Sequence, residues 1–264
     1  MTLRTALAQG TKLLEDGAID APRLTAEVLL AHALRVERVY LIAHAGDELS
    51  ELGWIHYGRY LHQRLRRVPT QYITHRQEFY GREYYVEPGV LIPRPETELL
   101  VEAVLPFITP ASTVLDIGTG SGCIAVTLAL ESSARVFASD ISIDALRIAR
   151  RNGALNTALC DLGSAFASGS FDVVVSNPPY VPAADVLAPE VRDNEPAQAL
   201  FSGADGLDAI RRLIPEAQRL LKPGGVLAFE FGFGQSAAIR ALLPTATIMP
   251  DLAGIDRVAV LRTS

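Results

Sequence analysis

The chain has 264 residues, of which 49% are hydrophobic, and a formal net charge of -6 at pH 7. This hydrophobic content is ample for packed cores in one or two domains. The acidic balance argues against a large duplex-binding surface, because nucleic-acid binders carry a basic footprint. No apolar run approaches the roughly 20 residues of a membrane span, and the N-terminus lacks a signal-peptide pattern. We therefore expect a folded, monomeric, cytoplasmic protein that engages neither membrane nor nucleic acid.

The two cysteines, Cys123 and Cys160, have neither Cys-x-x-Cys spacing nor paired histidines beside them. The sequence therefore predicts no metal site and no disulfide framework. We expect both cysteines to be small core residues. We also expect them to be reduced, because the cytosol is a reducing compartment.

Residues 1–75 are predicted to form a small helical bundle that positions a protein partner. A first helix carries an apolar stripe of Leu3, Leu7 and Leu14. A second helix opens at Asp20-Ala-Pro22, and its apolar positions are Leu24, Val28 and Ala31. A later, longer helix ends at Pro69, and its apolar positions are Leu52, Ile55, Leu61 and Leu65.

Residues 76–95 are predicted to link this bundle to a second domain. Glu78 to Gly89 reads as a β-hairpin centred on Gly81. The extended Pro93-Arg-Pro95 follows, and a helix is expected from about Glu96. Pro93-Arg-Pro95 is equally compatible with a stiff connector and with a place beside an active site.

Residues 96–264 alternate strands and helices, which predicts a doubly wound, mostly parallel α/β sheet. The expected strands lie near residues 113–117, 135–139, 155–160, 171–176, 225–230 and 257–262. The expected helices lie near residues 122–131, 142–152, 205–221 and 235–243. If the first and fourth strands are neighbours, the segments that follow them meet at the switch point where such sheets bind ligands.

A glycine-rich turn, Gly118-Thr-Gly-Ser-Gly122, stands between the first expected strand and a helix opening near Ser121. Glycines at alternating positions let the backbone approach a ligand closely, and the helix N-terminus offers free N–H groups. The dinucleotide fingerprint needs a glycine where Cys123 stands, so the turn departs from it. The spacing predicts a nucleotide-type site of another kind.

Two carboxylates follow the next two expected strands. Asp140 lies 20 residues after Gly120 (140 - 120), where doubly wound sheets place an acceptor for ribose hydroxyls. The alternative is a helix N-cap, and the glycine turn upstream favours the ribose. Asp161 falls at the end of the third expected strand and could accept from an adenine amino group.

The tetrapeptide Asn177-Pro178-Pro179-Tyr180 directly follows the fourth expected strand. A planar nitrogen is a poor nucleophile, so a site that alkylates it must accept hydrogen bonds from both N–H groups. The Asn177 side chain supplies one acceptor, and the prolines leave the Pro178 carbonyl as a second. Tyr180 offers a flat wall for stacking. The alternative is a strand that ends in a proline turn, and the cofactor-type turn upstream favours the clamp.

Four segments together resemble the release-factor glutamine methyltransferases of the PrmC/HemK type, over nearly the whole chain. Ile92-Pro-Arg-Pro-Glu-Thr-Glu98 is the most family-specific. Residues 115–122 resemble motif I of S-adenosylmethionine-dependent methyltransferases, and the other two segments are residues 174–180 and 221–230. Asn-Pro-Pro-Tyr also occurs in DNA adenine methyltransferases and in some RNA or ribosomal-protein methyltransferases.

The resemblance implies a seven-stranded, Rossmann-like methyltransferase sheet and an N-terminal substrate-binding domain. It implies methyl transfer from S-adenosyl-L-methionine to the side-chain amide nitrogen of the glutamine in the Gly-Gly-Gln loop of class 1 release factors. Asn177 and Pro178 would be catalytic, within a substrate clamp of Asn177, Pro178, Pro179 and Tyr180. The implied cofactor residues are Gly118, Thr119, Gly120, Ser121, Gly122, Asp140, Asp161, Leu162 and Asn177.

The chain departs from the family at the expected adenine contacts in two ways: the stretch 152–161 is shorter than in the family, and Leu162 replaces a residue that is often aromatic. No role follows for the segment 192–196, which ends in Glu-Pro. Three alternatives stay open: a ribosomal-protein glutamine methyltransferase, a nucleic-acid amino methyltransferase acting on a flipped base, and a non-catalytic S-adenosylmethionine-binding protein. A nicotinamide-dependent oxidoreductase is disfavoured by Cys123.

Overall fold

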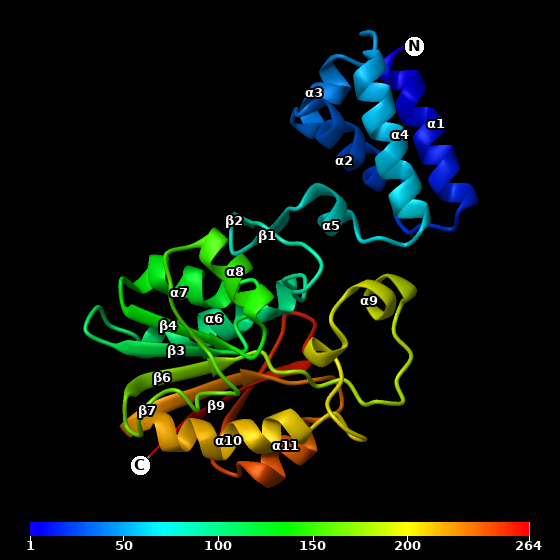
Figure 1. Ribbon diagram of the computed structural model, residues 1–264. Helices are drawn as coiled ribbons and strands as arrows, with labels where there is room; N and C mark the ends of the chain where they lie inside the picture. The colour runs from blue at the N-terminus through cyan, green and yellow to red at the C-terminus, as the bar shows by residue number, and fades with distance from the viewer. Residues whose placement is uncertain (264) are drawn as a thin grey trace. The chain divides into compact units, whose positions relative to one another are not determined.

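The structure, a computed structural model, describes residues 1–263 and divides into two compact units (Figure 1). The first unit comprises residues 1–76 and 188–194, and the second comprises residues 77–187 and 195–264. The division at residues 75 and 95 that we expected stays a prediction. No helix among residues 1–263 combines the length and apolarity needed to cross a membrane.

The first unit is helical. Its elements are α1 (Leu3–Asp16), α2 (Pro22–Leu34), α3 (Arg38–Ala43), α4 (Glu51–Leu65), α5 (Thr70–Thr74) and α9 (Pro189–Asn194). Side-chain caps begin two of the long helices, because Thr2 accepts from the N–H of Thr5 and Ser50 accepts from that of Gly53. Leu3, Leu7 and Leu14 are buried in a single core, as their spacing predicts.

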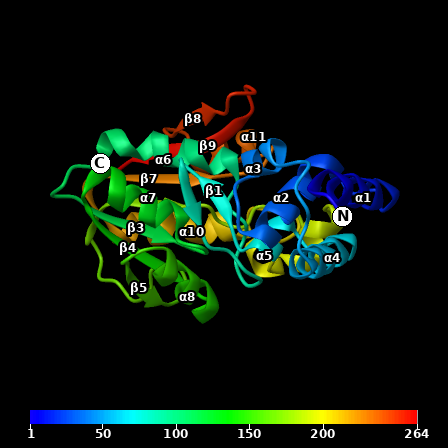
Figure 2. The ribbon, with the colours of Figure 1, turned by 90° about the horizontal axis from the view of Figure 1, so that it is seen from above.

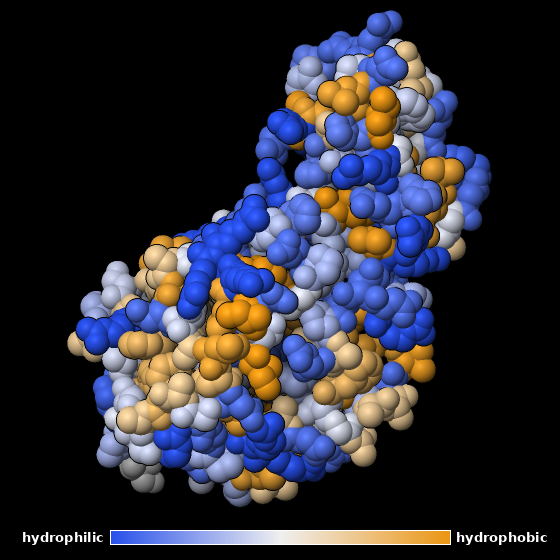
Figure 3. All heavy atoms as spheres, in the orientation of Figure 1, coloured by the Kyte–Doolittle hydropathy of each residue, from blue (hydrophilic) through white to orange (hydrophobic). Residues whose placement is uncertain are grey.

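The predicted apolar stripes are wrong at three positions: Leu24, Leu52 and Ile55 are 46%, 64% and 57% exposed. The buried face of α4 instead follows Gly53, Tyr57 and Leu61, which are spaced four residues apart on one side of the helix. Figure 3 shows apolar side chains interspersed with polar ones over this unit. The short helices α3 and α5 were not predicted, because five or six residues hold too little periodicity.

The second unit begins with the predicted hairpin, β1 (Gln77–Phe79) and β2 (Arg82–Tyr84). Tyr80 and Gly81 both have positive φ, at 53° and 69°, as a two-residue turn between twisted strands requires. Phe79 and Tyr84 are buried and anchor the hairpin on the core of the unit.

A seven-stranded sheet forms the centre of the second unit, in the order β5-β4-β3-β6-β7-β9-β8, and Figure 2 shows β5 and β8 at its opposite edges. The first five run parallel, and β9 is antiparallel to both its neighbours. The strands are β3 (Thr113–Ile117), β4 (Arg135–Asp140), β5 (Asn156–Leu159), β6 (Phe171–Ser176), β7 (Leu221–Glu230), β8 (Thr247–Pro250) and β9 (Asp256–Arg262). The predicted doubly wound, mostly parallel sheet is confirmed. The edge strand β8 was not among the strands expected from the sequence.

Helices cover both faces of this sheet (Figure 1). On one face lie α6 (Glu98–Val104), α7 (Cys123–Ser132) and α8 (Ile143–Asn152), and on the other lie α10 (Asp208–Leu220) and α11 (Ser236–Leu242). Three short 3₁₀ turns connect elements: η1 (Pro95–Thr97), η2 (Leu105–Phe107) and η3 (Ala197–Ala199). Successive residues of a strand enter opposite cores, so Val173 and Val175 face the first layer and Val174 the second.

Candidate active site

The sheet brings the glycine turn and the tetrapeptide together. Strands β3 and β6 are parallel neighbours in which Ile117 pairs with Ser176, so Gly118 and Asn177 leave adjacent strands at the same edge. The Ser176 hydroxyl donates to the carbonyl of Ile117 over 2.8 Å and ties the two strand ends. The order of the strands reverses at this point, which is where open α/β sheets bind ligands.

The glycine turn adopts a backbone that side chains would oppose. Gly118, Gly120 and Gly122 have φ of 71°, 54° and 82°. An added Cβ at Gly118 or Gly120 would meet open space, whereas one at Gly122 would lie 3.0 Å from Cα of Ala149 in α8. Gly118 and Gly120 therefore keep the backbone bare for a ligand, and Gly122 permits close helix packing.

Asp140 holds the turn in place. Its Oδ2 accepts from the N–H of Gly120 over 2.9 Å, and its Oδ1 accepts from that of Ser142 over 2.8 Å. Asp140 is not the N-cap of α8, because Ser142 caps that helix through the N–H of Ala145. Each carboxylate oxygen keeps a second lone pair, so the group can still accept from a ribose hydroxyl. Burial raises its pKa, and its hydrogen bonds to backbone N–H groups oppose that rise.

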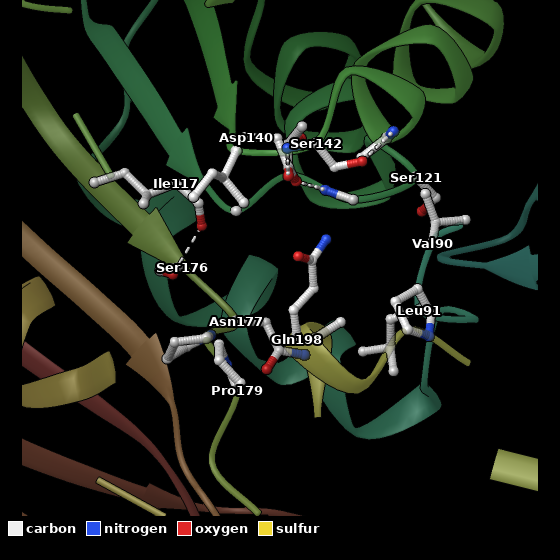
Figure 4. A pocket seen from close by; sticks show the side chains of 18 of the residues that line it. Val90, Leu91, Ile117, Ser121, Asp140, Ser142, Ser176, Asn177, Pro179 and Gln198 are labelled. Atoms are coloured by element: carbon white, nitrogen blue, oxygen red, sulfur yellow. Dashed lines mark hydrogen bonds between the residues drawn. The ribbon is translucent and has the colours of Figure 1, made fainter. Parts of the chain in front are cut away.

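A cavity of about 300 Å³ opens beside the turn, within the size range of small-molecule sites (Figure 4). All predicted cofactor residues except Gly122 line it, and so do Pro178 and Pro179 of the clamp. Tyr180 does not line it and packs instead beside the second core cluster. The role of Tyr180 as a stacking wall stays a prediction.

The clamp is anchored by a chain of hydrogen bonds. Asn177 Nδ2 donates to Thr97 Oγ1 over 2.9 Å, and Thr97 Oγ1 donates to Glu230 Oε2 over 2.6 Å. Tyr180 donates its hydroxyl to Glu230 Oε1 over 2.8 Å. The sequence interpretation assigned no role to Thr97 or Glu230, although each lies in a segment that carries the family resemblance.

The predicted adenine contacts lie on the pocket wall but have other partners. Asp161 Oδ2 accepts from Arg212 Nη2 in an exposed ion pair. Leu162 has a φ of 51°, unusual for a branched residue. Cys160 is half-buried and lines the pocket, so its prediction as a core residue is wrong; the third strand ends there at an open edge. Cys123 is buried as expected, and burial raises its pKa to about 12.

The sequence interpretation assigned no role to two further parts of the pocket. Arg94 lines it, and Glu195 Oε1 accepts from Arg94 Nη2 over 2.5 Å while Glu195 Oε2 accepts from the N–H of Ile92 over 2.9 Å. This pairing explains the Glu-Pro segment and places Pro93-Arg-Pro95 beside the site. Gln198 points its amide into the cavity (Figure 4), and no periodicity around η3 could have revealed it.

Two protein-family models match the chain: the PrmC N-terminal domain over residues 5–74, and the methyltransferase small domain over residues 95–193. A solved structure with a similar fold is a T. thermophilus 16S rRNA methyltransferase (RsmC) in complex with AdoMet and guanosine. It is 20% identical, has a TM-score of 0.53, and covers 72% of this chain and 50% of its own. The solved structure shows the shared fold, and the match to the methyltransferase small domain defines this part of the chain as a methyltransferase domain.

Relatives that align over nearly the full length identify the family within the methyltransferases. The release factor glutamine methyltransferase of Koribacter versatilis is 44% identical, and the alignment covers 99% of both chains. That of Moorella thermoacetica is 41% identical over 97% of both. The chain belongs to the family of release factor glutamine methyltransferases.

Proposed function

We propose that this protein transfers a methyl group from S-adenosyl-L-methionine to the side-chain amide nitrogen of the glutamine in the Gly-Gly-Gln loop of class 1 peptide chain release factors. The observation that carries the proposal is the position of Asn177, beside the glycine turn on the neighbouring strand and at the wall of the pocket. This places an amide acceptor next to the segment that would hold a methyl donor.

The pocket residues fit such a cofactor. The open space over Gly118 and Gly120 admits a ligand against bare backbone. Asp140 keeps acceptor capacity for ribose hydroxyls, and Thr119 and Ser121 extend the polar wall. When bound, the cofactor supplies a sulfonium methyl group as the electrophile.

Asn177 and Pro178 then act on the substrate nitrogen. The amide oxygen of Asn177 and the carbonyl oxygen of Pro178 accept its two hydrogens, which holds the nitrogen and directs its lone pair at the methyl group. No strong general base is needed, because the nitrogen becomes acidic as the C–N bond forms and its proton can leave to water. The Pro178-Pro179 pair keeps this acceptor geometry rigid, since proline fixes φ.

A direct experiment offers the protein a purified class 1 release factor, labelled cofactor and, in parallel, DNA and RNA. We expect label in the release factor alone, and a mass increase of one CH₂ group on the peptide with the Gly-Gly-Gln glutamine. A release factor with that glutamine changed to alanine is the matched control and should stay unlabelled. Label in nucleic acid alone, or in the control as strongly as in the native factor, would refute the substrate assignment.

Asn177→Ala tests the clamp in the same assay. Loss of the shared acceptor should lower kcat on the order of 100-fold, by comparison with the removal of one oxyanion-hole donor. Normal turnover in this variant would remove Asn177 from the mechanism.

A further inference from the structure

The four residues of the clamp have few anchors of their own. Pro178 and Pro179 lack backbone N–H groups, so they cannot donate to neighbouring elements. The ends of the tetrapeptide do have anchors: the Tyr180 carbonyl accepts from Gln235 Nε2, and the side chains of both end residues lead to Glu230 at the end of β7. Asn177 reaches Glu230 through Thr97, and Tyr180 reaches it directly.

The donor and the acceptor of each hydrogen bond in this series follow from the groups that take part. An ionised carboxylate only accepts, and a threonine hydroxyl has one proton to give. Because Thr97 gives that proton to Glu230 over 2.6 Å, its oxygen can only accept from Asn177. The NH₂ end of the Asn177 amide must therefore face Thr97, which leaves the amide oxygen as the group available to a substrate.

Burial of the Glu230 carboxylate costs free energy that a purely structural contact would not require. Glu230 is 1% exposed and Thr97 is 2% exposed, and Glu230 directly follows the buried apolar run of residues 226–229 in β7. Among the described residues its hydrogen-bond partners are the hydroxyls of Thr97 and Tyr180, and no cation forms an ion pair with it. Burial raises its pKa, while the two hydroxyl donors and the charge of Arg257 oppose that rise. A buried carboxylate held by hydroxyls alone costs stability that an apolar side chain would save.

We propose that Glu230 and Thr97 are positioning residues, which orient the Asn177 amide with its oxygen towards the substrate nitrogen and fix both ends of the clamp. The inference rests on the proposed function for its turnover readout. Neither residue needs to touch the substrate nitrogen. Removal of either one should lower kcat by a larger factor than it weakens cofactor binding, because the glycine turn and Asp140 are untouched and only the Asn177 contact changes.

Thr97→Val is the sharpest test, since it keeps the shape of the side chain and removes the hydroxyl. We expect kcat to fall on the order of 10-fold, because a misoriented acceptor loses part of what its deletion loses. Thr97→Ser restores the hydroxyl and should restore kcat. Thr127→Val is the matched control: Thr127 is a buried threonine whose hydroxyl pairs with Tyr84 at 2.7 Å, away from the clamp, and its loss should leave kcat unchanged.

A double-mutant cycle separates positioning from general destabilisation. If Thr97 acts through Asn177, Thr97→Val should add no further loss of kcat to Asn177→Ala. Glu230→Gln should lower kcat in the native background. In the Asn177→Ala background it should lower kcat further only through the lost contact with Tyr180. The inference would be overturned if Thr97→Val kept the native kcat. It would also be overturned if Thr97→Val lowered kcat by the same factor in the Asn177→Ala background as in the native one.

A readout without turnover keeps this test separate from the proposed substrate. In protein labelled with ¹⁵N-asparagine, the side-chain NH₂ signal of Asn177 is identified by its disappearance in Asn177→Ala. We expect Thr97→Val to shift this signal and Thr97→Ser to restore it, because the Asn177 NH₂ donates to Thr97. An unmoved signal would refute the orienting contact even if the release factor is methylated. A shifted signal with no methylation of any release factor would refute the substrate and leave the contact standing.

Discussion

Asp116 lies in β3 directly before the glycine turn, fully buried on a strand at the centre of the sheet. Its Oδ2 accepts from the hydroxyl of Thr119 over 2.7 Å, while its Oδ1 has no hydrogen-bond partner among the described residues. Burial raises the pKa of this carboxyl to about 7, helped by the nearby charge of Asp140 and opposed by the Thr119 hydrogen bond. The folded protein thus favours the protonated acid.

The sign of the effect on stability follows from this pKa. A carboxyl whose pKa is raised on folding contributes its full stability below its unfolded pKa of 3.8 and loses that contribution as pH rises towards 7. At about 1.4 kcal/mol per pKa unit, ionisation of Asp116 costs about 4 kcal/mol between pH 4 and pH 8. Asp116→Asn removes this titration. The stability of the variant relative to the native chain should therefore rise by about 4 kcal/mol over that range, apart from a constant cost for its unpaired NH₂ group.

Urea unfolding at several pH values measures the effect. The single tryptophan, Trp54, belongs to the first unit, so its fluorescence follows that unit and serves as an internal reference, while far-UV circular dichroism follows both. Asp172→Asn is a control of opposite sign. Burial raises the pKa of Asp172, but hydrogen bonds from Lys222 and Thr113 outweigh it and leave the pKa lowered, so this variant should lose stability above pH 4. A difference between Asp116→Asn and the native chain that stays constant from pH 4 to pH 8 would refute the reasoning.

Three other substitutions probe the pocket. Gly122→Ala should destabilise the second unit by about 1–3 kcal/mol in urea unfolding, because its Cβ meets α8 at a positive φ. Gly120→Ala shares the strain of a positive φ but faces open space, so it should destabilise the unit less and should also weaken cofactor binding in calorimetry. Asp140→Asn leaves a single acceptor oxygen for two backbone N–H groups and a ribose, so we expect a cofactor Kd on the order of 10-fold higher, and an unchanged Kd would contradict that role. Glu195→Gln removes the charge that holds Arg94 and should lower stability by about 1–3 kcal/mol, with native stability counting against the pairing.

The sequence predicted the features that depend on a single strand, helix or turn. The strand periods, the glycine turn and the hairpin at Gly81 are local patterns, and the structure has them where they were expected. The adjacency of Gly118 and Asn177 also followed, because parallel strands joined by helices leave few arrangements of a sheet. The edge strand β8 and the short helices carry no comparable pattern.

The missed residues share a different physical reason. Glu230 and Thr97 lie 133 residues apart, and Arg94 and Glu195 lie 101 apart. Each looks unremarkable in its own segment, since a glutamate at a strand end and a threonine near a helix start are ordinary surface choices. What makes them part of the site is burial and pairing after folding, which no local periodicity records.

In the proposed mechanism the clamp sets the type of reaction but does not set which substrate is methylated. An amide and an exocyclic base amine are both planar NH₂ groups, so in the proposed mechanism the Asn177 oxygen and the Pro178 carbonyl would hold either one. Substrate choice must then come from surfaces that the tetrapeptide does not supply. We propose that the first unit, which matches the PrmC N-terminal domain, supplies such a surface. If chemistry and selectivity are divided in this way, a variant of the clamp should lose turnover for every substrate alike, whereas a variant of the first unit should change which substrate is methylated.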